Sequence, residues 1–336
     1  MNNNATFQDP SAIMSLATAY WNSQIFLTAH RIGLFSLLAK TAKTSEQIAI
    51  ALNTKPRPTA LLLNACVALG ILEKDREYYK NAPSTEFFLV PGSPAFMGNA
   101  ISYSDDLYET WGKLEQCLRE DKPMLPPAEY LGSDVEKTRH FVYGMHNRAM
   151  GTASALVNLV DLGDRRQLLD VGGGPSTYSC MFAGRYPELK SKVLDLPGIV
   201  AHANDIISSM GKQHQVSTLP GDYHTTEFPE DNDVVLISGV FHRESEQDCR
   251  KLINKAADSL NSGGMLIISD VFADMGCCSP VFATLFAVNM ALTAENGGIH
   301  ADADVMKWMA DAGFTGLEIK KFPPPMPHRL IAGYKQ

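Results

Sequence analysis

A glycine-rich run flanked by acids is the strongest chemical signal in the sequence. Asp170-Val171-Gly172-Gly173-Gly174 follows a short apolar run and precedes a helical pattern. Glycines allow the backbone to turn tightly and a ligand to approach the main chain closely. Asp195 ends the next apolar run, about 20 residues further on, where an acid can accept both hydroxyls of a ribose. Loop and acid together predict a cofactor that contains a nucleoside; a glycine turn without a ligand is the alternative.

NAD and S-adenosylmethionine both fit this outline, and three features favour S-adenosylmethionine. The loop reads Gly172-x-Gly174-x-x-Thr177, so the third glycine of the dinucleotide-binding pattern is missing. Asp170 stands immediately before the loop, where it can orient the loop amides or meet a cationic methionine group. Two strand-like runs at 316–322 and 329–334, with no helix between them, predict an antiparallel hairpin that a plain dinucleotide fold lacks.

The elements that position these residues alternate between strand and helix from residue 166 onward. Short apolar runs bounded by Gly, Asp or Pro alternate with helical stretches, which is typical of a parallel sheet covered on both faces. We therefore predict an α/β fold with a Rossmann-like parallel sheet that ends in an antiparallel C-terminal hairpin. The expected strands are 167–171, 192–196, 216–219, 233–238 and 264–271, and the expected helices are 177–186, 198–210, 245–260 and 303–313.

The first 100 residues have a mostly helical pattern instead. Apolar positions recur at helical spacing over 11–40, and Thr44-Ser45-Glu46-Gln47 has the form of a capping box that starts a short helix. A turn over 53–58, a helix over 59–70 and a hairpin over 71–79 complete the outline of a winged helix. The predicted domains are 1–100, a helical linker that lines the substrate site at 101–165, and the cofactor-binding domain at 166–336.

Composition excludes several classes of function. A net charge of -8 argues against a general nucleic-acid binder. No run of about 18 apolar residues occurs, so we expect no membrane span. The six scattered cysteines form no CxxC pair, and the first residues lack the pattern of a signal peptide, so we expect a cytoplasmic protein. No His, Asp and Cys cluster has metal-ligand spacing, so we expect no metal.

Five motifs together resemble those of class I S-adenosylmethionine-dependent O-methyltransferases of the hydroxyindole and caffeate type. They are Asp170–Gly174, Asp195-Leu196-Pro197, Gly221-Asp222-Tyr223, Ser238–Cys249 and Ser262-Gly263-Gly264. The resemblance spans about residues 10 to 335 and implies an N-terminal winged-helix domain that forms a homodimer. It implies S-adenosylmethionine as cofactor and a hydroxyl of a small, largely apolar or aromatic molecule as methyl acceptor. It assigns cofactor binding to Asp170, Gly172, Gly174, Asp195, Leu196, Asp222, Tyr223 and Ser238.

The family carries a catalytic histidine after the fourth strand, and His242 matches it. An imidazole can take a proton from a hydroxyl near neutral pH. The alternative is that His242 merely caps the following helix. The family's Asp-Trp after the histidine is Arg243-Glu244 here, and its two glutamates beside the base correspond to Asp270 and His300. Carboxylate support for His242 would then come from Asp270 or Glu244.

Further departures and pocket residues complete the expected site. Ser176 stands where the family usually has glycine, and Arg243 would hold an acceptor oxygen as an oxyanion if it points into the site. The catalytic candidates are thus His242, Arg243 and Asp270. The resemblance places the acceptor wall on two helices, one before the glycine loop and one after the fifth strand, and on the loop that follows. The candidates there are Phe141, Met145, His146, Phe286, Asn289, Met290 and His300.

Other functions remain open on the sequence alone. Transfer of the methyl group to carbon or nitrogen, or a non-methylating reaction with the cofactor merely bound, would use the same fold. A DNA-binding regulator is a third possibility, because winged helices often bind DNA. Its recognition helix, 57–69, offers almost no polar face after Arg57, so a buried or dimer-forming role is favoured. The sequence does not name the acceptor.

Overall fold

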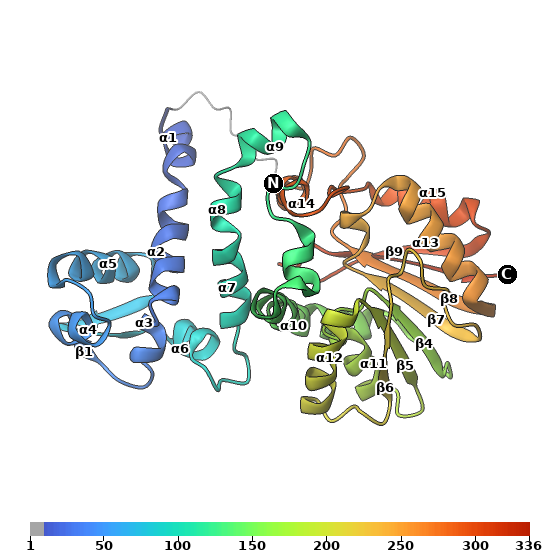
Figure 1. The fold of residues 1–336 in the computed structure, drawn as a ribbon, viewed down its shortest axis with the longest axis horizontal. Helices are drawn as coiled ribbons and strands as arrows, with labels where there is room; N and C mark the ends of the chain where they lie inside the picture. Colours follow the sequence, from blue (N-terminus) through green and yellow to red (C-terminus); the bar gives the residue numbers. More distant parts are fainter. Residues whose placement is uncertain (1–9) are drawn as a thin grey trace. The chain divides into compact units, whose positions relative to one another are not determined.

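The chain forms two compact units, Met1–Asp106 and Leu107–Gln336, in a computed structural model that describes residues 10–336 (Figure 1). Residues 1–9, on which the expectation of no signal peptide partly rests, lie outside the described residues. All six cysteines are free; Cys277 and Cys278 are exposed and the other four are buried.

The first unit combines helices with a small antiparallel sheet of order β1-β3-β2. The predicted capping box is present: the Thr44 hydroxyl accepts from the Gln47 amide, and the Gln47 side chain accepts from the Thr44 amide. The predicted hairpin is also present, as β2 and β3. The elements are α1 (Pro10–Thr18), α2 (Tyr20–Arg31), α3 (Leu34–Leu37), β1 (Lys43–Thr44), α4 (Ser45–Ala51), α5 (Pro56–Ala68), β2 (Leu72–Asp75), β3 (Tyr78–Asn81), α6 (Pro83–Leu89) and α7 (Gly98–Asp106).

The predicted turn over 53–58 ends too late, because α5 already begins at Pro56. A proline is well suited to the first helical turn, where its missing N–H has no helical partner and its fixed φ favours the helix. Its ring therefore starts the helix here instead of interrupting it. Leu63 and Cys66 on this helix pack with Leu34, Phe35 and Ile48 in the core of the unit.

The second unit opens with helices and continues into a seven-stranded sheet. The helices before the sheet are α8 (Tyr108–Trp111), α9 (Leu114–Glu120), the π-helical η1 (Glu129–Ser133) and α10 (Val135–Leu159). The strands are β4 (Gln167–Val171), β5 (Lys190–Asp195), β6 (Val216–Pro220), β7 (Asn232–Ser238), β8 (Leu260–Asp270), β9 (Phe314–Lys321) and β10 (Arg329–Lys335).

The order of the strands is β6-β5-β4-β7-β8-β10-β9. The first five strands pair in parallel, and β10 runs antiparallel to both of its neighbours, β8 and β9. The predicted parallel sheet with an antiparallel C-terminal hairpin is confirmed. The strand predicted at 264–271 begins earlier, at Leu260, because this segment pairs with Asn232 at the start of β7.

Helices cover both faces of this sheet (Figure 1). Apolar residues of α13 and α15 pack against one face, and those of α10 and α11 against the other, where α12 packs beside α11. The chain leaves β4 toward β5 on one side and later returns to β7 on the other side. Ligands of open α/β sheets bind outside the strand carboxyl ends at such a switch point. The connecting elements are α11 (Thr177–Arg185), α12 (Pro197–Ser209), the short 3-10 helix η2 (Phe241–Arg243), α13 (Glu246–Ser259), α14 (Val281–Thr293) and α15 (Asp302–Asp311).

The glycine loop between β4 and α11 uses left-handed backbone conformations. Gly172 and Gly174 have φ values of 64° and 53°, and Ser176 has a φ of 63°. A side chain on Gly173 would lie 2.6 Å from the Asp170 carboxyl carbon and 2.7 Å from Val193. The loop therefore needs glycine at positions 172–174, whereas Ser176 holds a conformation that suits glycine better.

Replacing Ser176 with glycine is expected to stabilise the protein. A non-glycine residue in this conformation costs about 1–2 kcal/mol, and the buried Ser176 hydroxyl has no hydrogen-bond partner among the described residues. The added flexibility of the unfolded chain offsets about 0.5–1 kcal/mol of this gain. Chemical denaturation should show Ser176→Gly to be more stable by about 0.5–1.5 kcal/mol.

Ser154→Gly is the matched control, because Ser154 is exposed within α10. Glycine in a helix should destabilise the protein there by about 0.5 kcal/mol. Equal destabilisation by both substitutions would contradict the strain assigned to Ser176.

Candidate active site

Asp195 at the end of β5 accepts two backbone amides, one of which, from Gly174, joins it to the glycine loop. Its Oδ2 accepts a hydrogen bond from Gly174 N–H at 2.7 Å, and its Oδ1 accepts one from Leu196 N–H at 2.7 Å. Burial raises the pKa of Asp195 to about 6, against the opposing effects of these amides and of the Arg243 charge. The side chain nevertheless keeps some exposure, so it can meet a ligand that lies on the loop.

Asp170 lies fully buried behind the loop. The Ser179 hydroxyl donates to its Oδ2 at 2.6 Å, and the Ser191 hydroxyl donates to Ser179 at 2.8 Å. Burial raises the pKa of Asp170 to about 7. Its second oxygen, Oδ1, has no hydrogen-bond partner among the described residues. Asp170 therefore fixes the start of α11 through Ser179 and keeps one acceptor free.

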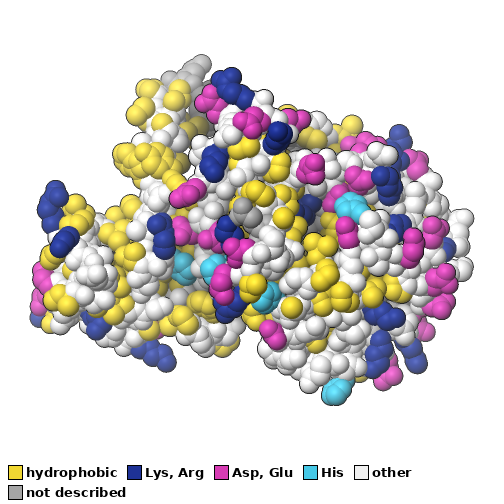
Figure 2. Space-filling model, in the orientation of Figure 1, with side chains coloured by type: hydrophobic (Ala, Val, Ile, Leu, Met, Phe, Trp, Pro, Cys, Tyr) yellow, Lys and Arg dark blue, Asp and Glu magenta, His cyan; other side chains and the backbone are white. Residues whose placement is uncertain are grey.

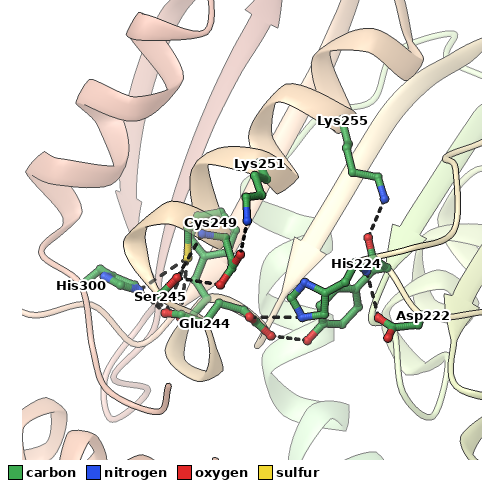
Figure 3. Close-up of polar contacts among 11 residues, drawn as sticks. Asp222, His224, Glu244, Ser245, Cys249, Lys251, Lys255 and His300 are labelled. Carbon is green, nitrogen blue, oxygen red and sulfur yellow. Dashed lines mark hydrogen bonds and ion pairs between the residues drawn. The ribbon is translucent and has the colours of Figure 1, made fainter. Parts of the chain in front are cut away.

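Tyr223, Glu244 and His224 form a polar cluster beside the loop. Figure 3 shows His224 facing Glu244. The Tyr223 hydroxyl donates to Glu244 Oε1 at 2.6 Å, and His224 Nε2 lies 3.3 Å from Glu244 Oε2. Burial and the Glu244 charge raise the pKa of Tyr223 well above its ordinary value, so the phenol stays protonated. A side chain on Gly172 would come within 3.4 Å of the Tyr223 ring, which places the ring against the loop. Asp222 accepts from the His224 amide at 2.9 Å.

His242 forms a hydrogen-bonded pair with Asp270. Its Nδ1 lies 2.7 Å from Asp270 Oδ1, across 28 residues of sequence, and its backbone N–H donates to Asp270 Oδ2 at 3.3 Å. Burial alone would raise the pKa of Asp270. The charge and hydrogen bond of His242, together with the Val271 amide, hold that pKa below its ordinary value. Because the carboxylate can only accept, Nδ1 is assigned the proton, and Nε2 is left as the basic nitrogen.

The remaining contacts of His242 also leave Nε2 as the basic nitrogen. No described side chain hydrogen-bonds to Nε2. The Phe286 ring on α14 packs edge-on against the imidazole, with ring centroids 4.9 Å apart. The following helix, α13, is capped by Ser245, which accepts from the Asp248 amide. The alternative that His242 serves as this cap is therefore wrong.

Arg243 extends from the same turn toward Tyr130 of η1. Its guanidinium donates to the Tyr130 hydroxyl at 3.2 Å and lies 5.7 Å from the centre of that ring. The Tyr130 hydroxyl in turn donates to the Thr293 carbonyl at the end of α14. Sequence reasoning missed Tyr130, because 113 residues separate it from Arg243 and no periodic pattern singles it out.

Four of the predicted acceptor residues, Phe141, Phe286, Asn289 and Met290, lie around η1 and α14. Phe282 stacks on Phe286 along α14, and Asn289 on that helix accepts a hydrogen bond from Trp111 Nε1 at 3.0 Å. Met290 is buried on the same helix, and Phe141 on α10 packs against the Tyr130 ring at 5.2 Å. These contacts gather around η1 and α14, together with the unpredicted Trp111.

The other three residues predicted for the acceptor wall, Met145, His146 and His300, have different surroundings. His146 Nδ1 lies 2.8 Å from the Thr177 hydroxyl at the start of α11, beside the glycine loop, and burial lowers its pKa. Met145, one residue earlier on α10, is half-buried. The His300 ring is directed at backbone carbonyls of the turn that carries His242, and not at its imidazole. Ser238, which was predicted to bind the cofactor, is the last residue of β7 and precedes η2 by a two-residue connection.

Two kinds of feature are absent from residues 10–336. No group of three or more His, Cys, Asp or Glu side chains in this range is placed to hold a metal ion. Within the same range, no helix is long and apolar enough to cross a membrane.

Comparison with known protein families agrees with this arrangement of fold and site. The O-methyltransferase domain matches residues 114–315, and the O-methyltransferase dimerisation domain matches residues 14–91. The chain belongs to the S-adenosylmethionine-dependent O-methyltransferase family, and S-adenosylmethionine is its cofactor. The predictions of family, fold class, enzyme class and cofactor are confirmed.

Named relatives cover nearly the whole chain. The 3-hydroxy-5-methyl-1-naphthoate 3-O-methyltransferase of Streptomyces sahachiroi is 30% identical over 330 residues, which cover 97% of this chain and 95% of the relative. The N,N-dimethyltransferase OxyT of Streptomyces rimosus is 28% identical over 334 residues, which cover 96% of each. Human N-acetylserotonin methyltransferase, solved in complex with SAM, shares the fold with a TM-score of 0.88 at 22% identity, over 99% of each chain.

Proposed function

We propose that the protein transfers the methyl group of S-adenosylmethionine to a hydroxyl of a small, largely apolar or aromatic acceptor, with His242 as general base. The observation that carries this proposal is the His242–Asp270 pair at the carboxyl edge of the sheet. The Nδ1–H group donates to Asp270, so Nε2 can take the acceptor's proton. The Asp270 carboxylate then stabilises the imidazolium that results.

The residues around the glycine loop fit the cofactor. Asp195 would accept the ribose hydroxyls. An added side chain on Gly174 would meet nothing within 4 Å, so space adjoins the loop that Asp195 contacts. Asp170, buried behind the loop, would support the methionine part indirectly, because it holds Ser179 of α11 in place beside the loop. Asp222 and Tyr223 would flank the adenine, with Leu196, Gly172 and Ser238 completing the site. The bound cofactor supplies a methyl group on a positively charged sulfur.

The protein's own contribution is alignment in a site that excludes water. Holding two reactants in line can supply about 7–11 kcal/mol of the barrier. The acceptor wall would include Phe141, Met145, Phe286, Asn289 and Met290, which suit a flat ring. Arg243 would hold an oxygen of the acceptor, and His146 would close the wall near the loop. The name of the naphthoate relative supports an aromatic hydroxyl as the target.

Methylation of nitrogen is the second candidate, and the relative OxyT favours it. The same base and cofactor residues would serve an amine. Matched aromatic alcohol and amine acceptors, compared by mass spectrometry of their products, decide between the two. Transfer to the amine alone would overturn the O-methyl assignment. The cytoplasmic location stays a prediction.

We propose that residues 1–100 form the homodimer interface, consistent with the matched dimerisation domain. No residue of α1 is buried, and Figure 2 shows hydrophobic side chains gathered over α1 and the start of α2. The exposed fractions there include 67% for Leu16 and 56% for Trp21. Such a contiguous apolar surface indicates a protein interface.

Charged substitutions on α1 and α2 should dissociate this dimer. Light scattering is expected to give a mass near twice 36.8 kDa for the parent and near 36.8 kDa for Leu16→Asp combined with Trp21→Asp. Val135→Asp, at a site 69% exposed in the second unit, is the control and should leave the mass unchanged. A monomeric parent protein would contradict the proposed interface.

Cofactor affinity should fall as the pH drops through about 6. The buried Asp195 carboxyl has a pKa raised to about 6, so it gains a proton below that pH. A neutral carboxyl accepts ribose hydroxyls less well than a carboxylate. Calorimetry should show the Kd for S-adenosylmethionine rising by up to about tenfold per pH unit below pH 6.

Asp195→Asn removes the group with the pKa of about 6 and is the control for this experiment. Its binding should be weaker by about 1–3 kcal/mol above pH 7 and, between pH 5 and 7, lack the fall near pH 6, whereas a step near pH 7 would belong to the other buried acid, Asp170. A parent protein whose affinity is constant over that range would contradict the role of Asp195.

Loss of His242 should abolish most of the turnover and leave cofactor binding intact. His242→Ala is expected to lower kcat by about 10²–10⁴-fold. Asp270→Asn should also lower kcat, because an amide can donate to Nδ1 and favour the wrong tautomer. Single-turnover kinetics and calorimetry on one identified acceptor provide the measurement. His214→Ala, at an exposed histidine, is the control; full activity in His242→Ala would eliminate the base assignment.

A further inference from the structure

The turn that carries His242 is short and depends on contacts from other segments. η2 contains only Phe241, His242 and Arg243, and a single 3-10 turn is held by few hydrogen bonds of its own. Its carbonyl groups accept hydrogen bonds from residues 298–300. The Gly298 amide donates to the His242 carbonyl at 2.9 Å.

His300 makes the central contacts to this turn (Figure 3). Its Nε2 lies 3.1 Å from the Phe241 carbonyl oxygen and 3.0 Å from the Glu244 carbonyl oxygen. Both oxygens can only accept, so Nε2 carries a proton shared between them. Cys249 Sγ lies 3.5 Å from the same nitrogen, and the ring packs edge-on against Trp308 at 5.1 Å. One N–H group therefore spans both ends of η2.

The segment around His300 also joins the other two elements that reach His242. The Ala273 amide, which follows Asp270 by three residues, donates to the His300 carbonyl at 3.0 Å. A side chain on Gly297 would collide with the Met290 carbonyl, so glycine lets this segment pass close to the end of α14. α14 carries Phe286 onto the imidazole. The same segment thus links the turn, the strand that supplies Asp270, and the acceptor wall.

We infer that His300 is a positioning residue, which holds the two ends of the η2 turn so that His242 keeps its hydrogen bond to Asp270. This inference rests on the proposed role of His242 as base. It differs from the sequence-based assignment of His300 to the acceptor wall. His300 acts here as a donor to two backbone carbonyl oxygens. A donor at this position is what the turn requires.

An isosteric pair of substitutions separates these roles. Gln and Glu have the same shape, but only Gln offers an N–H group to the Phe241 and Glu244 carbonyls. His300→Gln should keep kcat within about threefold of the parent. His300→Glu should lower kcat by about 10–100-fold, as expected for a displaced base, with the Kd for S-adenosylmethionine within about twofold of the parent. Activity equal to the parent in His300→Glu, with a loss in His300→Gln, would overturn the proposal.

A third substitution guards against a general loss of folding in the Glu variant. His300→Phe keeps an aromatic ring against Trp308 but removes the donor. It should show the same loss of kcat while its melting temperature stays closer to that of the parent than the Glu variant's does. Parent-like turnover in His300→Phe would overturn the proposal. His214→Gln, His214→Glu and His214→Phe, at an exposed histidine, are matched controls and should leave kcat unchanged.

A spectroscopic readout tests the inference without any acceptor. The His242 Nδ1 proton can be identified by NMR of ¹⁵N-histidine-labelled protein through its loss in His242→Ala. Its resonance should be retained in His300→Gln and shifted or exchange-broadened in His300→Glu and His300→Phe. An unchanged resonance in all three variants would overturn the positioning role. If the parent methylates no acceptor, the proposed function fails, and this resonance still decides the role of His300.

Discussion

Burying a carboxylate at the end of a strand is the constraint around which this site is built. An ionised carboxylate in a dry environment is costly unless hydrogen bonds or an opposite charge compensate it. Three strands end in such groups, and each is compensated differently. Asp170 has a hydroxyl partner and Asp195 has two amides, and burial still raises both pKa values. Asp270 has an imidazole and keeps a lowered pKa.

This difference separates the roles of the three acids. A carboxyl that stays charged can hold a protonated nitrogen, and Asp270 does so for Nδ1 of His242. The imidazole is thereby fixed in one tautomer before any acceptor arrives. Asp195 is not committed to a charged partner, so its charge and hydrogen-bonding capacity are available to a ligand. The same strand edge thus holds one acid that is paired with an imidazole and one that is not, a few strands apart.

Glu244 connects the cofactor side of the site with the base. Its carboxylate accepts from the Tyr223 hydroxyl, and its backbone carbonyl accepts from His300. The residue lies at the end of the turn that carries His242. A movement of Tyr223 against the glycine loop would therefore reach the base through one buried side chain. In the proposed function, cofactor binding and the orientation of His242 share this connection.

The sequence predicted the elements of the catalytic unit well, because their signals are local. Alternating apolar runs marked the strands, and the glycine loop marked the carboxyl end of β4, beside the switch point between β4 and β7. The choice between Asp270 and Glu244 as the partner of His242 stayed open. Glu244 is two residues away and Asp270 is 28 away, and only the pairing of β7 with β8 brings Asp270 to the imidazole. Contacts such as Arg243 to Tyr130 depend on tertiary packing and leave no local signal.

Arg243 shows how a departure from the family pattern fits its surroundings. Its guanidinium donates to Tyr130, whose hydroxyl reaches the end of α14, and its charge opposes the rise in the pKa of Asp195. An acid at this position would repel Asp195 and favour its protonation. Because the pKa of Asp195 is already close to 6, the cation helps keep this carboxylate ionised at neutral pH. Arg243 therefore ties Tyr130 and the end of α14 to the η2 turn and favours the ionised form of Asp195 at the same time.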